Sequence, residues 1–403
     1  MMKKLLILGG SNYAIPVINK AHELGLYAIT ADYLPDNPAH KHADEYGNVS
    51  VIDKEAVLKF AQEKEIDGIV SFACDPGVVS AAYVAEKMGL PFQGPYKSVE
   101  ILQDKGLFRQ FLTDNGFKVP HARRYTDAET AVKDVDFFTW PVIVKPVDSA
   151  GSKSVTKVEK PEDLPAAIEE AYDGSHSGAF VIEDFITFES YHSSSEVFTV
   201  DGKVVFNVFA DDLFDDDSAN PYVPALDIWP GTMKQAYQDE LNAEVQRLMT
   251  LLDMKTGIYN LEVVVGKGGI PYIMECSPRG GGGRLAEIIE CAYGVPLLEN
   301  EVRKAVGMPL LEIKQGPSDG HWAVKNIHTA GDESGVFKSV TIDKDIEEKY
   351  IKYMQLYVNE GDYIHPFTGA NMSMGDMFIR CDTREQLDQV AAGYRHWLHI
   401  NLE

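Results

Sequence analysis

The segment LEVVVGKGGIPYIMECSPRGGGGR (residues 261–284) holds two apolar runs around a glycine-rich turn, a pattern that predicts a β-hairpin. Each predicted strand carries one carboxylate, Glu262 in the first and Glu275 in the second. Alternate side chains share a face of a strand, so Ile273, Glu275 and Ser277 are expected to point the same way. Because an unpaired buried charge is unstable, the two carboxylates are predicted to share Mg²⁺ (or Mn²⁺), which prefers oxygen ligands. The alternative is a solvated hairpin with two edge carboxylates.

A glycine run follows the second predicted strand. Arg279 precedes Gly280–Gly283, and Arg284 closes the run. We predict a carboxylate-binding site in this run, formed by the Arg284 guanidinium and the backbone N–H groups of Gly281 and Gly282. A guanidinium group can bind a carboxylate through two parallel hydrogen bonds. This order of residues indicates a metal site beside an anion-binding turn.

The composition limits the classes of partner. The chain has 403 residues, enough for two or three domains, and its 37 basic and 62 acidic side chains give a formal charge of −25. Such a charge repels nucleic-acid backbones and anionic membranes. No apolar run approaches the ~20 residues of a membrane span, and the opening MMKKLLILGG is too short for a signal peptide. The four cysteines show no C-x-x-C spacing. We therefore expect a cytoplasmic protein with small-molecule substrates and neither nucleic-acid nor membrane partners.

The first hundred residues alternate between strand and helix patterns, which predicts a parallel sheet covered by helices. The expected strands are residues 3–8, 27–31, 49–52 and 68–73, and helices are expected after the first, third and fourth of them. Ligands bind at the carboxyl ends of such strands, so Gly10 and Asp75 are candidate substrate-binding residues. The turn Gly9–Ala14 lacks the G-x-G-x-x-G spacing of dinucleotide sites, although Asp32 lies where a ribose-binding acid would.

Mixed patterns follow after residue 103. Residues 104–120 are predicted to form one helix that ends at Gly116. The apolar face of this helix is expected to hold Leu107, Phe108, Phe111 and Leu112. Residues 211–232, rich in acids, prolines and aromatics, are predicted to be a long loop. Further expected strands are residues 141–145, 155–158, 180–186, 322–328 and 376–381, and further expected helices are 238–253 and a last one from about 384, capped by Thr383.

One lysine-bearing turn is a candidate phosphate site. The apolar strand before it ends on Lys145, and Pro146 forces the chain to turn. Lysine supplies a point charge for phosphate, and backbone N–H groups of a small polar loop can close over phosphate oxygens. The candidate residues of this loop are Ser149, Gly151, Ser152 and Lys153. A simple glycine–serine hairpin is the alternative, since the loop is not a G-x-x-x-x-G-K-[ST] motif.

Two adjacent acids lie in the predicted strand 180–186. Neighbours on a strand face opposite ways, so only one of Glu183 and Asp184 can face a buried ligand. Glu183 is predicted to accept a hydrogen bond from an adenine amino group, while backbone groups of Asp184, Phe185 and Ile186 pair with the ring edge. A solvated strand end would show the same pattern.

The order and spacing of these segments resemble those of the ATP-grasp enzymes, over residues 1 to about 300. The matching segments are Asp104–Arg109 with Val119-Pro120, Val144–Pro146, Ser149–Lys153, Glu183–Ile186, Glu189, Glu262, Glu275 and Arg279. The resemblance implies that Lys105 and Lys145 are the two ATP lysines, that 149–153 is the mobile phosphate loop and that 183–186 is the adenine hinge. It also implies that Glu189 binds the ribose, with His192 as a competitor.

The same resemblance assigns the metal and the catalytic arginine. Glu262 and Glu275 match the magnesium carboxylates, and Arg279 matches the arginine that stabilises the reacting acyl group. Two positions depart from the family. Ser277 stands where an asparagine usually binds the second Mg²⁺, and Ser154 stands where a glycine usually ends the phosphate loop.

The fold that the resemblance implies is α/β, or α+β overall. Residues 1–103 would form a Rossmann-like substrate domain, and residues 104–300 an ATP-grasp domain whose lid lobe spans about 120–186. Residues 301–403 would form a mixed α/β subdomain that completes the site. The family resemblance also favours a homodimer.

The expected activity is ATP-dependent ligation. A carboxylate would be activated as an acyl phosphate and attacked by an amine, with Lys145 and Arg279 as catalytic residues and ATP and Mg²⁺ bound. An amino-acid or peptide-type carboxylate–amine ligase is ranked first. The alternatives are a phosphoribosylamine–glycine ligase, a subunit of a carbamoyl phosphate synthase type, and an ATP-binding regulator that has lost turnover.

Overall fold

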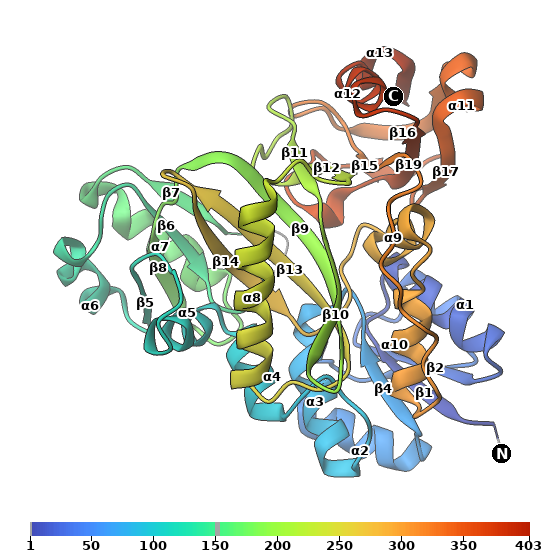
Figure 1. Cartoon of the computed structure of the whole chain (residues 1–403), viewed down its shortest axis with the longest axis horizontal. Helices are drawn as coiled ribbons and strands as arrows, with labels where there is room; N and C mark the ends of the chain where they lie inside the picture. The colour runs from blue at the N-terminus through green and yellow to red at the C-terminus, as the bar shows by residue number, and fades with distance from the viewer. Residues whose placement is uncertain (1, 150–153) are drawn as a thin grey trace.

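The computed structural model of the chain describes residues 2–149 and 154–403, with Phe188–Tyr191 described by their backbone alone. Figure 1 shows a central twisted sheet, a lobe of small strands and helices on its left, the N-terminal layer below and the C-terminal elements above. Among the described residues no helix is both long enough and apolar enough to cross a membrane.

The N-terminal layer is a parallel sheet in the order β3-β2-β1-β4. Its strands are β1 (Lys4–Leu8), β2 (Tyr27–Asp32), β3 (Glu45–Asn48) and β4 (Gly68–Ser71), and its helices are α1 (Ile15–Glu23), α2 (Lys54–Lys64) and α3 (Asp75–Met88). Leu6 and Leu8 pack in one apolar cluster and Leu5 and Ile7 in another, so both faces of β1 are buried. The alternating pattern therefore predicted this sheet correctly.

The third strand lies earlier than the sequence predicted. Residues 49–52 form a turn instead of a strand, because Asp53 caps α2 by accepting a hydrogen bond from the Ala56 backbone N–H at 3.0 Å. Strand β3 occupies Glu45–Asn48, a polar segment whose pairing with β2 its composition did not indicate.

The left-hand lobe is a four-stranded antiparallel sheet in the order β5-β8-β6-β7. Its elements are β5 (Ala122–Tyr125), α6 (Ala128–Lys133), β6 (Val142–Pro146), β7 (Thr156–Val158), α7 (Leu164–Asp173) and β8 (Phe180–Asp184). Helices α4 (Tyr96–Gln103) and α5 (Lys105–Asp114) lead into this lobe. The lobe occupies part of the range predicted for the lid, about 120–186, and its role as a lid stays a prediction.

Helix α5 packs three of the four residues of its predicted apolar face inward, Phe108, Phe111 and Leu112. Phe108 and Leu112 are buried as expected, but Leu107 is 44% exposed and Arg109 is only 2% exposed. The apolar residues alone suggested a stripe centred on 107 and 108. A buried ion pair of Arg109, described below, rotates the helix by about one position.

The central sheet has the order β10-β9-β13-β14 and is antiparallel throughout. Its strands are β9 (Phe188–Val200), β10 (Lys203–Phe209), β13 (Gly257–Gly266) and β14 (Ile270–Ser277), and helix α8 (Gln235–Leu251) covers one face. A register shift lies at Met274, because Glu275 is opposite Glu262 while Ile273 is opposite Val263. The predicted common face of Ile273 and Glu275 is therefore wrong: Ile273 and Cys276 face the apolar core under α8.

The C-terminal elements form two further sheets, ordered β11-β12-β15-β19-β17 and β18-β16-β20. The strands are β11 (Asp211–Phe214), β12 (Pro224–Trp229), β15 (His321–Ile327), β16 (Gly335–Ile342), β17 (Ile351–Leu356), β18 (Tyr363–Ile364), β19 (Gly375–Cys381) and β20 (Leu398–Leu402). The helices are α9 (Leu285–Tyr293), α10 (Leu297–Ala305), α11 (Lys344–Tyr350), α12 (Arg384–Ala392) and α13 (Tyr394–Trp397). The predicted loop 211–232 thus contains two paired strands, in which Asp212 is opposite Asp227 and Leu213 is opposite Leu226, while residues 215–223 form the connection.

Candidate active site

The face of the central sheet opposite α8 carries the predicted metal carboxylates. Glu262 on β13 is directly opposite Glu275 on β14 and directly opposite Ser194 on β9. Two carboxylates in neighbouring register positions repel each other. Burial and the Glu275 charge both raise the pKa of Glu262, while His192 and Lys105 lower it.

This pair fits a divalent cation. Mg²⁺ commonly binds one or two protein carboxylates and completes its shell with water and phosphate oxygens. The residues that the structure describes contain no group of three or more His, Cys, Asp or Glu side chains arranged around one metal position. The protein would therefore supply Glu262 and Glu275, and the remaining ligands would be phosphate and water.

Ser277 stands where the family has an asparagine metal ligand, but its hydroxyl is already hydrogen-bonded to protein groups. It is fully buried, donates to Asp75 Oδ1 at 2.9 Å and accepts from Gln103 Nε2 at 2.6 Å. Its hydroxyl thus joins β14 to helices α3 and α4. This geometry does not support Ser277 as a metal ligand.

Lys105 lies between the carboxylate pair and the predicted phosphate loop. Its Nζ is 3.0 Å from Glu275 Oε2 and donates to the Ser149 carbonyl at 3.1 Å. Burial opposes the charge, but Glu275, Asp75 and Glu262 together raise the pKa of Lys105. The first of the two predicted ATP lysines is therefore cationic and adjacent to the metal carboxylates.

Lys145 is held by Glu183. The Lys145 ammonium donates to Glu183 Oε1, and Arg109 Nε donates to Glu183 Oε2 at 2.8 Å. Arg109 also donates to the Met274 carbonyl at 2.8 Å, at the register shift of β14. Burial alone would raise the pKa of Glu183, but Arg109 and Lys145 lower it to about 2.

This pairing corrects two expectations about Glu183. Its side chain is 3% exposed, so the alternative of a solvated strand end is wrong. Both carboxylate oxygens bind cations, so the carboxylate is not open to an adenine amino group. The sequence missed this role because Arg109 is 74 residues away and belongs to a helix.

The other hinge residues lie at the end of β8. Asp184 faces away from Glu183, accepting from the Thr139 backbone N–H at 2.8 Å and pairing with His121 at 3.0 Å. The Phe185 N–H donates to the Pro141 carbonyl at 3.0 Å, and the Lys157 ammonium is 4.5 Å from the centre of the Phe185 ring. Ile186 is half-buried. Gly151, Ser152 and Lys153 and the Glu189 side chain lie outside the described residues, so their assignments stay predictions.

Ser154, the other departure from the family pattern, has a backbone φ of +54°. This left-handed conformation favours glycine over residues with a side chain. The backbone at this position therefore has the geometry expected of the glycine that it replaces.

Arg279 and Asp75, predicted in separate roles, form one bidentate ion pair. Arg279 Nε donates to Asp75 Oδ1 at 2.8 Å and its NH2 group donates to Oδ2 at 2.6 Å. Both are largely buried, and Asp75 is the first residue of α3. The pair joins the N-terminal layer to the glycine run and fixes the direction of the guanidinium.

Two backbone N–H groups of the predicted substrate-binding residues have partners within the protein. The Gly10 N–H donates to Asp32 Oδ2 at 3.0 Å, and the Gly281 N–H donates to Glu196 Oε1 at 2.8 Å. Burial raises the pKa of Glu196 to about 8. These two amides are therefore not available to a substrate, and the sequence did not identify Glu196. Gly282 lies beside the Tyr13 ring.

Arg284 points to the C-terminal subdomain instead of an open anion site. It is 5% exposed and donates to Glu287 Oε1 at 2.6 Å, to the Tyr357 hydroxyl at 3.1 Å and to Gln355. Beside Glu262, His192 Nδ1 is 2.7 Å from Asp212 Oδ2. The acidic composition of residues 211–217 was the only sequence signal for Asp212.

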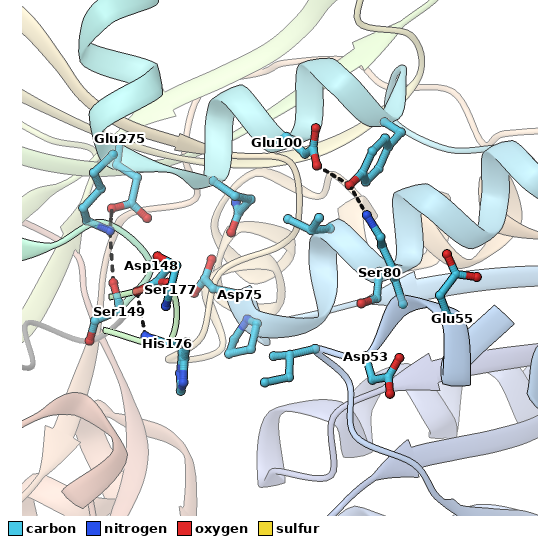
Figure 2. Close-up of a pocket in the computed structure, with 17 residues that line it drawn as sticks. Asp53, Glu55, Asp75, Ser80, Glu100, Asp148, Ser149, His176, Ser177 and Glu275 are labelled. Atoms are coloured by element: carbon cyan, nitrogen blue, oxygen red, sulfur yellow. Dashed lines mark hydrogen bonds and ion pairs between the residues drawn. The ribbon is translucent and has the colours of Figure 1, made fainter. Parts of the chain in front are cut away.

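Two adjoining cavities open beside these residues. One, of about 670 Å³, is drawn in Figure 2, where Glu275, Ser149 and Asp75 gather at one end and Glu55 and Glu100 lie at the other. The second, of about 410 Å³, reaches Gly9, Gly10 and Ser11 at the carboxyl end of β1. Asp75, Pro76, Asp148, Ser149 and His176 line both cavities. Of the predicted site residues, those that line these two cavities are Glu275, Lys105, Ser149, Asp75 and Gly10.

Comparison with known proteins agrees with this geometry. Residues 102–283 match the ATP-grasp domain family. This match assigns residues 102–283 to the ATP-grasp superfamily, which includes ATP-dependent carboxylate ligases, as the order of the motifs predicted.

Individual relatives extend over most of the chain. The C-terminal section of the carbamoyl phosphate synthase large chain from Aquifex aeolicus is 23% identical over 327 residues, covering 78% of this chain and 60% of that protein. A formate-dependent phosphoribosylglycinamide formyltransferase from Bacteroides thetaiotaomicron is 23% identical over 394 residues, 96% of each chain. The crystal structure of an L-amino acid ligase from Bacillus licheniformis aligns with a TM-score of 0.81 at 20% identity, over 100% of this chain and 99% of that one. The names of the three differ in activity, so the comparisons leave the substrate open.

Proposed function

We propose that this chain is a Mg²⁺-dependent ligase that uses ATP to activate a carboxylate as an acyl phosphate and joins it to an amine. The observation that carries the proposal is the position of Lys105, which contacts both Glu275 and the Ser149 carbonyl. A phosphate bound there would meet a lysine, a carboxylate pair suited to Mg²⁺ and the start of the small polar loop. Lys105, Glu275 and Ser149 line the 670 Å³ cavity, and Glu262 is opposite Glu275 in the sheet.

The proposed reaction has two steps, and different residues act in each. In the first, a carboxylate oxygen attacks the γ-phosphorus of ATP and ADP leaves; in the second, the amine nitrogen attacks the acyl carbon, phosphate leaves and the nitrogen loses a proton. Phosphoryl transfer needs alignment and charge neutralisation more than a protein nucleophile. Lys105 and Lys145 would hold the phosphates, and Mg²⁺ on Glu262 and Glu275 would neutralise their oxygens. Arg279, oriented by Asp75, would stabilise the oxyanion of the second step.

An amino acid or peptide is the first candidate for the carboxylate and the amine. The support is the similarity along the whole chain to the L-amino acid ligase fold. The second candidate is acylation of a phosphoribosylated amine, which the formyltransferase relative favours because it aligns over 96% of both chains. The 410 Å³ cavity beside Ser11 has room for such a group.

Phosphate release from Mg-ATP, measured over a grid of carboxylates and amines, tests the proposal. The grid includes amino acids, dipeptides, and phosphoribosylglycinamide with formate, and mass spectrometry identifies the products. A product with the mass of acid plus amine minus water supports a ligase and identifies the substrates. ATP binding without phosphate release for any pair would refute turnover by this chain alone and favour a regulator or a missing subunit.

A further inference from the structure

A separate cavity of about 390 Å³ lies in the C-terminal subdomain. It is enclosed by strands β11, β12 and β15 and by helix α12, which lie together at the top of Figure 1. It shares no lining residue with the two cavities of the candidate active site. Most of its wall is apolar: Leu213, Phe214, Ala225, Leu226, Ala391 and Ala392.

This cavity lies on the side of the sheet that faces away from the active site. Lys325 on β15 is opposite Leu226 on β12, and both line the cavity. The next pair, Val324 and Asp227, alternates to the other face, where Asp227 is within electrostatic range of Glu262. A ligand in this cavity would therefore be separated from the reacting groups by the sheet itself.

Lys325 is the charged group at the polar end of the cavity. It is 3% exposed, its Nζ is 3.0 Å from His328 Nε2, and it is 4.0 Å from the centre of the Tyr394 ring. Among the side chains that the structure describes, no carboxylate forms an ion pair with it, and Asp215 Oδ2 instead lies 3.6 Å from His328 Nε2. His328 is a neutral acceptor, because burial and Lys325 lower its pKa to about 3.

The two acids that line the cavity already have cationic partners. Asp215 pairs with Arg395 at 2.5 Å and accepts from the Tyr394 hydroxyl, and Asp388 accepts from Arg384 at 2.8 Å. These pairs leave Lys325 with a neutral imidazole and an aromatic face. Burial lowers the pKa of Lys325 to about 7, and Asp215 offsets only part of this effect.

A buried ammonium group without an anion lowers the stability of the fold, because no ion pair offsets the free energy lost when the ammonium leaves water. A methionine would fill the same volume without that loss. We propose that this cavity binds a small aliphatic monocarboxylate, with its carboxylate on Lys325 and its hydrocarbon against the apolar wall. A carboxylate suits the site better than a phosphate because one cation faces a mainly hydrocarbon surface. This proposal does not depend on the proposed ligase activity.

Isothermal titration of the full chain with 4-methylpentanoate tests the proposal, with 4-methylpentanamide as the uncharged probe of the same shape. The acid should bind at least about tenfold more tightly than the amide, because a charge-assisted hydrogen bond contributes more than 1.4 kcal/mol. Lys325→Met should lose about the same factor. Lys105→Ala should bind like the unsubstituted chain, which separates this cavity from a carboxylate site beside the metal.

One further variant and one further measurement keep the test decisive. Ala391→Phe retains the lysine but fills the cavity, and it should abolish binding of the acid. In the absence of ligand, Lys325→Met should melt at the same temperature as the unsubstituted chain or higher. A markedly lower melting temperature would show that Lys325 has a structural role and overturn the proposal. Equal binding of acid and amide, absence of binding, or full binding by Lys325→Met would also overturn it.

Discussion

Glu183 offers the sharpest test of the site geometry. Replacing it by glutamine keeps the size of the side chain but removes the charge that faces Lys145 and Arg109. Both cations would then lie in a buried position without a carboxylate, since Arg109 is 2% exposed and the Lys145 side chain 12% exposed. Removing one partner of a buried ion pair is strongly destabilising for this reason.

The size of the effect follows from the pKa of Glu183. A pKa lowered from 4.5 to about 2 by Arg109 and Lys145 corresponds to roughly 3 kcal/mol of stability at neutral pH. The folded-state pKa lies below the unfolded value, so the contribution is fully present above pH 4.5 and is lost as the pH falls towards 2. For a cooperative unit of 150–250 residues, such a loss lowers the melting temperature by roughly 6–12 °C.

Thermal unfolding at pH 7, followed by circular dichroism, measures this shift. Glu129→Gln is the matched control, because Glu129 also belongs to the lid and pairs with a lysine but is 81% exposed. The control should shift by no more than about 2 °C. The double variant Glu183→Gln with Lys145→Met should recover part of the loss, since it removes one of the stranded charges. Equal melting of Glu183→Gln and Glu129→Gln would refute the pairing.

Three shorter predictions concern turnover and the phosphate loop. Glu275→Gln should abolish Mg²⁺-dependent phosphate release with an unchanged circular dichroism spectrum, and full activity would contradict the metal assignment. Lys145→Ala should weaken ATP binding by about tenfold or more in a fluorescence titration. Lys160→Ala, whose side chain is 64% exposed, is the control and should change ATP binding little. Equal effects of the two variants would indicate a general effect of positive charge and not a specific ATP site. Ser154→Gly should stabilise the fold by about 0.5–1 kcal/mol, because it relieves backbone strain, and should therefore raise the melting temperature slightly. Ser50→Gly, at an ordinary φ, should lower the melting temperature. The opposite order would refute the strain at residue 154.

Local patterns were enough to predict the parts of the site that depend on local structure. The hairpin that carries Glu262 and Glu275 was visible as two apolar runs around glycines, and the structure places the two carboxylates opposite each other. The alternation of strand and helix likewise predicted the N-terminal parallel sheet. In each case the periodicity of a short segment determines which way its side chains face.

Features that depend on distant contacts were not predictable in the same way. An extra residue, Met274, shifts the register of β14 and interrupts the alternation of its side chains between the two faces of the sheet. The Met274 carbonyl accepts a hydrogen bond from Arg109, which belongs to helix α5. Glu183 looked like a ligand for adenine because its partner is far away in sequence. An ion pair between distant segments leaves no local periodicity, so it is visible only when the fold brings the segments together.

The charges around the phosphate end explain why a metal should be required. Lys105, Lys145 and Arg109 face an equal number of carboxylates, Glu183, Glu262 and Glu275, so the site offers no excess positive charge to a polyphosphate. A divalent cation on Glu262 and Glu275 would release Lys105 from Glu275 and make the site net positive. The same reasoning separates binding from turnover in Glu275→Gln. That variant removes a negative charge, so metal-free ATP should bind at least as tightly as before even though phosphate release is lost. Loss of metal-free binding together with turnover would show that Glu275 positions Lys105 and would refute the charge argument.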